Sequence, residues 1–224
     1  MSKLRSASEQ VYLEVKERIL SATLPGGELI SEGEIASEMG TSRTPVREAF
    51  LRLEAEGWMR LFPKRGALVV PVADGETEHV LAARLLLEAD AARVVARGPE
   101  HVRVDLVRGL RANLDAQRAA AADGDVAEFS GLDADFHGLI VRAGGNPLLV
   151  TFYIGLRERQ RRMTARSLNR DPRQLQSIID DHVHLADLVE AGDAGAFAVA
   201  DDIHMRRVHG LPAPTAVGTE GGAR

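Results

Sequence analysis

Apolar residues recur at helical spacing near the start of the chain and predict its first element. Val11, Val15 and Ile19 are four residues apart, so they share one face of a helix over roughly 8–22. The Leu-Pro-Gly-Gly sequence at 24–27 then ends the helix in a turn. This amphipathic start lacks the apolar core of a signal peptide, which favours a helix over a targeting segment.

Two more helices are expected next, separated by a tight turn. Ser31 and Glu34 have the spacing of a capping box, and they predict a short helix that ends at Gly40. A third helix is expected to run to about Glu56, because Pro45 fits the first turn of a helix, where its missing N–H costs nothing.

Two short β-prone runs follow and predict a hairpin. Residues 58–62 and 67–70 are rich in aromatic and aliphatic side chains, and a Pro-Lys-Arg-Gly sequence at 63–66 separates them. Helix, turn, helix and basic hairpin, in this order, are typical of a winged helix-turn-helix.

After Pro71 the pattern predicts helices only. Six helical stretches are separated by joints that contain Gly, Asp or Pro. They are expected near residues 74–97, 99–122, 125–143, 146–166, 172–191 and 193–209. Such short connections favour an antiparallel bundle. The predicted fold is therefore mainly α, with a winged helix-turn-helix domain over 1–72, an all-helical bundle over 73–210 and a disordered tail over 211–224.

Composition narrows the class of protein. The 224-residue chain is 45% apolar and 27% charged, as in a soluble globular protein. It has no cysteine, which excludes disulfides, a thiolate zinc site and a cysteine nucleophile, and favours a cytoplasmic location. No apolar run approaches the roughly 20 residues of a membrane span, so no membrane association is expected.

Basic residues are concentrated in one short stretch. Lys and Arg number 28 against 33 Asp and Glu, which argues against a general polyanion binder. Residues 43–65 nevertheless hold six basic and three acidic side chains. This local excess suits a DNA-contacting surface on an otherwise acidic protein.

The predicted DNA-contacting surface combines the start of the third helix with the hairpin tip. Its candidate residues are Ser42, Arg43, Thr44, Arg47, Arg52, Lys64 and Arg65. Arg43 and Arg47 share a helix face, from which a guanidinium can bind guanine O6 and N7 in the major groove. Arg52 would contact a phosphate, and the hairpin tip would reach the backbone or the minor groove. The alternative is a solvated helix face whose arginines pair with Glu48 and Glu54.

Residues 24–66 closely resemble the N-terminal DNA-binding region of the GntR family of bacterial transcription regulators. The resemblance rests on the stretch 42–49, Ser-Arg-Thr-Pro-Val-Arg-Glu-Ala, which is nearly the family's signature. It implies that the two arginines of this stretch read bases and that Gly66 approaches the DNA at the wing. Some members have an arginine where this chain has Gly33, so that contact is expected to be absent.

Four residues of the predicted bundle have a spacing that suits a metal site. Asp133 and His137 lie one turn apart on one helix face. His182 lies ten residues before Gly192 and His204 twelve residues after it, so antiparallel helices place both imidazoles at a similar depth. One carboxylate with three imidazoles suits a divalent first-row ion such as zinc, with manganese or nickel as alternatives. By their spacing, His184 and Asp135 are expected to point away from this group.

The helical part of the chain resembles the effector domain of the FadR subfamily of GntR regulators, in its shorter, six-helix branch. The resemblance covers 80–209 and rests on the runs 83–88, 132–137, 143–147, 181–182 and 190–193. It implies that the metal ligands match the same aspartate and three histidines. It also implies that a small carboxylate effector sits beside the metal.

The sequence leaves the effector contacts open between two roles each. Arg84 is a candidate to bind the effector carboxylate, or it pairs with Glu88 one helical turn away. Asn146 is a candidate to line the pocket, or it caps the helix that starts at Pro147. The arginine-rich run over 157–162 is expected to be solvated, with the alternative that Arg157, Arg161 or Arg162 faces the cavity.

These features predict a metabolite-responsive transcription regulator. As a homodimer it would bind a near-palindromic operator in double-stranded DNA and repress until the effector binds. A metal-dependent hydrolase in the bundle is the alternative from another class, but no His-Glu-x-x-His sequence and no obvious general base support it, so enzymatic activity is not expected. A third possibility is a purely structural metal with a separate effector pocket.

Overall fold

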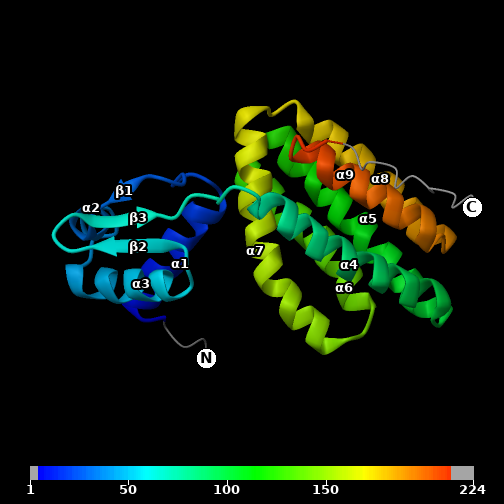
Figure 1. The fold of residues 1–224 in the computed structure, drawn as a ribbon, viewed down its shortest axis with the longest axis horizontal. Coiled ribbons are helices and arrows are strands. Elements are labelled where there is room, and N and C mark those ends of the chain that lie inside the picture. Colours follow the sequence, from blue (N-terminus) through cyan, green and yellow to red (C-terminus); the bar gives the residue numbers. More distant parts are fainter. Residues whose placement is uncertain (1–4, 213–224) are drawn as a thin grey trace, which may run out of the picture.

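A computed structural model describes residues 5–212, which form an N-terminal domain with a small sheet and a C-terminal bundle of helices (Figure 1). The N-terminal elements, together called the winged domain, are α1 (Ala7–Leu20), β1 (Leu29–Ile30), α2 (Glu32–Glu38), α3 (Arg43–Ala55), β2 (Met59–Phe62) and β3 (Gly66–Val69). The bundle consists of α4 (Glu76–Arg97), α5 (Glu100–Asp123), α6 (Val126–Ala143), α7 (Pro147–Arg170), α8 (Gln174–Ala191) and α9 (Ala194–Val208). The predicted fold class is confirmed.

The sequence also predicts a C-terminal tail and no membrane-spanning segment. Most of the predicted tail, 213–224, lies outside the described residues. Within the described part, no helix is both long and apolar enough to cross a membrane.

Local capping and an apolar core explain the winged domain. The side chain of Ser6 caps α1, and Ser31 and Glu34 form the expected capping box at the start of α2. The buried core of the domain joins α1, α3 and the sheet through Val15, Ile19, Val46, Phe50, Leu53 and Ala67. The helices α2 and α3 are thereby held at a fixed position next to the hairpin of β2 and β3, which forms the wing.

The sheet has three strands within residues 5–212, one more than the sequence pattern predicts. All pairs are antiparallel, in the order β1-β3-β2. In the missed strand β1, Leu29 lies opposite Leu68 and Ile30 opposite Ala67. A strand of two residues is too short to show the alternation by which strands are recognised.

Gly66 lies where β1 and β3 meet, and two constraints require glycine there. Its φ is +105°, and a Cβ atom would lie 2.3 Å from the carbonyl oxygen of Ile30. Gly66→Ala is therefore expected to lower the free energy of unfolding by more than about 1 kcal/mol. The matched control is Gly155→Ala in α7, where a Cβ meets open space and alanine is expected to be neutral or stabilising. Thermal unfolding of both variants measures the difference, and equal midpoints would contradict the packing of β1 against β3.

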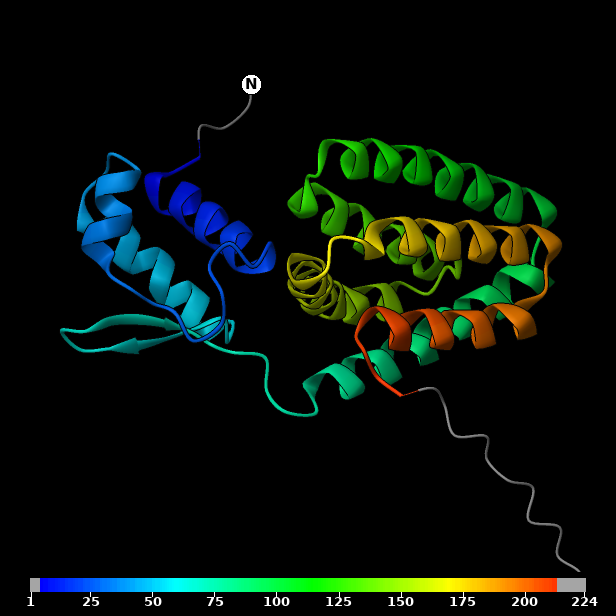
Figure 2. The same ribbon diagram turned by 90° about the horizontal axis from the view of Figure 1, so that it is seen from above.

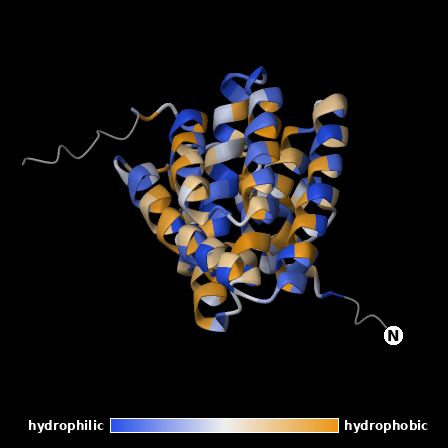
Figure 3. Ribbon diagram, turned by 90° about the vertical axis from the view of Figure 1, so that its right-hand side faces the viewer, coloured by the Kyte–Doolittle hydropathy of each residue, from blue (hydrophilic) through white to orange (hydrophobic). Residues whose placement is uncertain are grey.

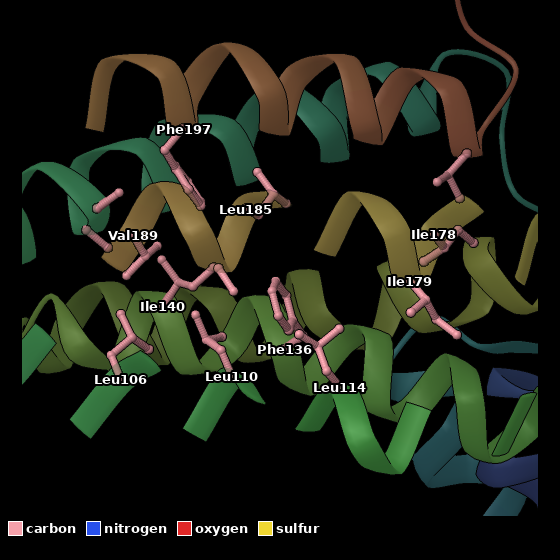
Figure 4. Packing of buried hydrophobic residues seen from close by; sticks show 14 of the residues in the cluster. Leu106, Leu110, Leu114, Phe136, Ile140, Ile178, Ile179, Leu185, Val189 and Phe197 are labelled. Atoms are coloured by element: carbon pink, nitrogen blue, oxygen red, sulfur yellow. The ribbon is translucent and has the colours of Figure 1, made fainter. Parts of the chain in front are cut away.

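The bundle helices begin at side-chain caps and pack through their apolar faces. Asp125, Asn146 and Asp193 cap α6, α7 and α9. Figure 3 shows hydrophobic and hydrophilic stretches alternating along the helices. The core between α5, α6, α8 and α9 (Figure 4) contains Leu106, Leu110, Leu114, Phe136, Ile140, Ile178, Leu185 and Phe197. This core fixes the depth at which polar side chains of the same helices meet.

Helix α7 is the bundle helix next to the winged domain, as Figures 1 and 2 both show. The end of its arginine-rich run lies at this junction, so the expectation of a solvated run was wrong for Arg161 and Arg162, whereas Arg159 is exposed. Arg161 forms an ion pair with Glu17 of α1, and Arg162 donates a hydrogen bond to the carbonyl of Val70. A charged helix face is solvated only where no other domain covers it, and the sequence pattern of α7 does not contain that information.

Candidate metal centre and DNA-binding surface

Three bundle helices bring four ligand-type side chains together. Helix α6 contributes Asp133 and His137, α8 contributes His182, and α9 contributes His204. Each offers one ligand atom, these atoms all lie within 4.8 Å of one another, and all four side chains are buried. The neighbouring positions of His182 and His204 agree with the similar depth expected on two antiparallel helices.

The three imidazoles turn the same ring nitrogen, Nε2, toward a common centre. The Nε2 atoms of His182 and His204 are 3.2 Å apart, and Asp133 Oδ1 lies 3.6 Å from His182 Nε2. His137 Nε2 is buried and has no hydrogen-bond partner among the described residues. Because buried polar atoms are rarely left unpaired, the orphaned nitrogen beside two other nitrogens and a carboxylate fits a bound cation.

The other ring nitrogen of each histidine, Nδ1, faces an acceptor from the surrounding helices. The pairs are His137 with Glu88 Oε2 at 2.6 Å, His182 with Gln117 Oε1 at 2.9 Å, and His204 with Asp181 Oδ2 at 2.9 Å. Such acceptors place the ring proton on Nδ1 and leave the Nε2 lone pair directed at the centre. This arrangement is characteristic of histidines that bind metals.

Asp133 is oriented in the same manner by α7. Its Oδ2 accepts hydrogen bonds from Gln160 Nε2 at 2.9 Å and from Thr164 Oγ1 at 3.2 Å. The other carboxylate oxygen, Oδ1, is left for the centre. Three nitrogens and one anionic oxygen form a donor set that fits a zinc ion.

Burial keeps the three histidines in their neutral form. It lowers the pKa of His182 well below the ordinary value and lowers the pKa of His204 to about 4. Burial also lowers the pKa of His137, although the Glu88 carboxylate opposes this shift. Since only a neutral imidazole has a free lone pair, these histidines are ready to bind a metal at neutral pH.

The metal-free protein is expected to lose stability as the pH falls from about 6.5, where histidines of the unfolded chain titrate, toward 4. In the folded protein, burial lowers the pKa of His204 to about 4. Between these values the unfolded state binds more protons than the folded state, so acid favours unfolding. Thermal unfolding at several pH values, with a chelator present, measures this dependence. His204→Gln should make the dependence shallower, and a slope equal to that of wild type would contradict the assignment.

A buried ion pair adjoins the histidines. Arg84 Nε donates to Glu88 Oε1 at 2.9 Å, which is the pairing that the sequence left open. Burial opposes the ionisation of Glu88, yet Arg84 and His137 hold the pKa of its carboxyl at about 2. Arg84 Nη2 is buried as well and has no hydrogen-bond partner in the part of the chain that the structure describes. One donor of the guanidinium is therefore still available to an anion.

Asp201 on α9 is a buried carboxyl that the sequence analysis missed. It is fully buried and its Oδ1 lies 3.7 Å from His137 Nδ1. No donor of the described residues bonds to its oxygens, and in its protonated form Asp201 shares a hydrogen bond with Glu88. Burial, together with the nearby Glu88 carboxylate, raises the pKa of Asp201 well above its usual range. Within the described chain, Arg84 thus leaves a donor and Asp201 leaves acceptor oxygens unpaired next to the candidate ligands.

Three other polar residues lie outside the buried cluster. Asn146 is exposed, and its side chain accepts hydrogen bonds from two N–H groups in the first turn of α7, which is the capping role that the sequence left open. His184 is exposed, and Asp135 is half-buried and paired with Arg157. Both therefore point away from the centre, as expected.

The DNA-contacting candidates gather at the start of α3 and on the wing. Ser42, Arg43, Thr44 and Arg47 are exposed, and the side chain of Ser42 makes no capping bond that would occupy it. A groove of about 530 Å³ separates α3 from the wing, and the basic residues that line it are Arg43, Arg47, Lys64 and Arg65. Gly33 leaves room for one of them, since a Cβ atom there would lie 3.2 Å from Arg43 Nη2.

Arg52 differs from the other arginines of α3. Arg52 forms ion pairs with Glu9 at 2.8 Å and with Glu56 at 3.3 Å. The other arginines of α3 form none with the described residues. The Arg52 guanidinium also stacks on Tyr12, 3.5 Å from the ring centroid. A phosphate contact by Arg52 would have to compete with these partners, whereas Arg43 and Arg47 have no such competition.

The chain matches two known families and several regulators. Residues 7–69 match the family of bacterial regulatory proteins, gntR family, and residues 79–207 match the FCD domain. The chain is 32% identical over 207 residues to an HTH-type transcriptional regulator from an unstable DNA locus of Streptomyces ambofaciens, covering 91% of this chain and 84% of the relative. It is 33% identical over 141 residues to the gluconate operon transcriptional repressor of Bacillus subtilis, covering 62% and 55%.

The fold also matches that of a solved structure. E. coli McbR/YncC superposes with a TM-score of 0.71 at 22% sequence identity, covering 91% of this chain and 95% of that one. The relatives are transcriptional regulators and not enzymes. The chain thus belongs to the GntR family of transcriptional regulators, with an N-terminal GntR helix-turn-helix domain and a C-terminal FCD domain.

Proposed function

We propose that this regulator is a repressor whose affinity for its operator is controlled by a small carboxylate, bound beside a metal ion in the FCD domain. Residues 1–72 bind double-stranded DNA, and residues 73–210 hold the metal and the effector. In a homodimer, two α3 helices about one DNA turn apart would meet the two halves of a near-palindromic operator.

The observation that carries this proposal is the convergence of four oriented ligand atoms in the buried interior of the bundle. Asp133, His137, His182 and His204 would hold the ion, with zinc favoured and manganese or nickel as alternatives. A bound divalent ion would supply positive charge and a further coordination position for a carboxylate. A full tetrahedral set of protein ligands would instead make the metal structural, and the experiment below separates these cases.

Unpaired polar groups beside the ligands indicate the class of effector. Among the described residues, Arg84 Nη2 is a donor without a partner, and Asp201 offers oxygens that accept no hydrogen bond. Because buried groups of this kind are costly to leave unsatisfied, a carboxylate that also carries hydroxyl groups complements both. One relative is named for the gluconate operon, and gluconate is such a hydroxy acid, which makes it the first probe.

Titration of the DNA upstream of the protein's own gene tests the proposal. The full-length protein is stripped of metal with a chelator, one portion is reloaded with zinc, and DNA binding is measured with and without gluconate and other small carboxylates. We expect an effective hydroxy acid to weaken binding by the zinc-loaded protein about 5- to 150-fold and to leave the metal-free protein unaffected. An equal effect on both portions would make the metal purely structural. No effect of any carboxylate would refute the proposed effector class.

A further inference from the structure

Helix α7 contacts the metal-ligand candidate Asp133 with one of its faces. Gln160 Nε2 and Thr164 Oγ1 both donate to Asp133 Oδ2. The hydroxyl of Tyr153 lies 3.2 Å from Gln160 Oε1, so both ends of the buried amide are engaged. The position of this carboxylate and the position of α7 are therefore linked by direct hydrogen bonds.

Other sides of α7 hold the winged domain. Arg161 Nη1 lies 2.7 Å from Glu17 Oε2 of α1. Arg162, whose side chain is largely buried, donates to the carbonyl of Val70, directly after β3. Residues that are adjacent in α7 to Gln160 thus bind the domain that carries the DNA-contacting surface.

Lys16 extends this contact to the end of the helix expected to enter the major groove. Its Nζ lies 2.8 Å from Glu158 of α7 and 2.9 Å from Glu56, the C-cap residue of α3. Only 13% of the Lys16 side chain is exposed, so water screens these ion pairs less than those on the open surface. A continuous series of contacts leads from Asp133 through α7 and Lys16 to α3.

We propose that α7 transmits changes at Asp133 to the winged domain, with Gln160 as the positioning residue that ties the helix to the ligand. This inference rests on the metal site proposed above. Because Gln160 and Glu158 belong to one helix, a movement of α7 that follows Asp133 also alters the contacts with Lys16 and α1. The ligand at the centre shifts DNA affinity in this way only if it binds the two domain arrangements with different affinity.

Trp58 provides a natural reporter of this junction. It is the single tryptophan of the chain and is 7% exposed. Its ring centroid lies 5.7 Å from Lys16 Nζ and 5.9 Å from Arg162 Cζ. The fluorescence of the full-length protein therefore reports on the contact between α7 and the winged domain without any label.

The test measures zinc binding by calorimetry and Trp58 emission at saturating zinc. The variant Glu158→Gln/Arg161→Gln removes two ion pairs with the winged domain and leaves the ligands untouched. Arg157→Gln is the matched control, since Arg157 pairs with Asp135 of α6. All three proteins are expected to bind zinc within about 2-fold of one another. Zinc should change the emission of wild type and of the control, and the double variant should lose most of this change.

A second variant interrupts the series at its other end. Gln160→Leu is expected to bind zinc about 10- to 100-fold more weakly and, once saturated, to lose the Trp58 response. An undiminished response in both interrupted variants, or zinc binding to wild type without any change of emission, would overturn the proposal. No zinc uptake in calorimetry would overturn the metal site and this inference together. An intact, α7-dependent response without any effect of carboxylates on DNA binding would support α7 and refute only the effector.

Discussion

Replacing His182 by alanine is expected to lower the affinity for zinc by more than about 100-fold, because removing a direct ligand costs more than removing a residue that only orients one. The side chain is fully buried, and its Nε2 lies 3.2 Å from His204 Nε2 and 3.6 Å from Asp133 Oδ1. Without this imidazole, which lies next to both His204 and Asp133, only three candidate ligands remain. Competition with a chromophoric chelator measures the affinity. DNA binding by the metal-free variant should be largely retained.

Two further variants compare the zinc affinity after loss of a residue that orients His182 and after loss of an exposed histidine. Gln117→Ala removes the acceptor that holds His182 Nδ1, so a loss of about 10- to 100-fold is expected. His184→Ala alters an exposed histidine two positions away on the same helix and should leave zinc affinity unchanged. Circular dichroism establishes that each variant is folded, and His182→Gln serves if the alanine variant is not. Equal zinc affinity in the His182 and His184 variants would place the ion elsewhere.

Much of the fold was predictable because the ends of its helices are encoded locally. The capping box of Ser31 and Glu34, and the cap before Pro147, each lie within a few residues of the helix they start. The four metal-ligand candidates could also be found from the sequence. Asp133 and His137 are one helical turn apart, and His182 and His204 lie at similar distances from the glycine that joins their helices. The short strand β1 was missed because only its pairing with β3 defines it.

The residues that orient the ligands could not be derived in this way. Glu88, Gln117 and Gln160 come from three different helices, and only packing of the bundle relates them to the histidines. One usable signal was overlooked: Gln117 continues the buried stripe of Leu110 and Leu114 in α5. A lone amide in an apolar stripe requires a buried partner, and here that partner is a histidine. Gln160 gave no such signal, because charged residues surround it in the sequence.

Arg47→Ala is expected to weaken specific binding to the operator by about 1–3 kcal/mol, the value of a bidentate contact between arginine and guanine. Arg47 is exposed in the groove between α3 and the wing, and no acidic side chain of the described chain forms an ion pair with it. The loss should be much smaller for DNA of unrelated sequence, because non-specific binding rests on phosphate contacts. Zinc content should stay normal, since the bundle is untouched. Fluorescence anisotropy with operator and unrelated DNA measures both affinities.

The comparison with Lys64 and Arg52 separates base reading from general attraction. Lys64→Ala at the hairpin tip should weaken binding to all sequences alike and reduce the salt dependence by about one phosphate contact. Arg52→Ala should have a smaller effect than Arg47→Ala, because the Arg52 guanidinium is engaged with Glu9, Glu56 and Tyr12 within the winged domain. If the Arg47 variant lost affinity for operator and unrelated DNA equally, α3 would contact the phosphate backbone and sequence would be read elsewhere. A selective loss of operator binding would place the side chain of Arg47 at the base edges of the major groove.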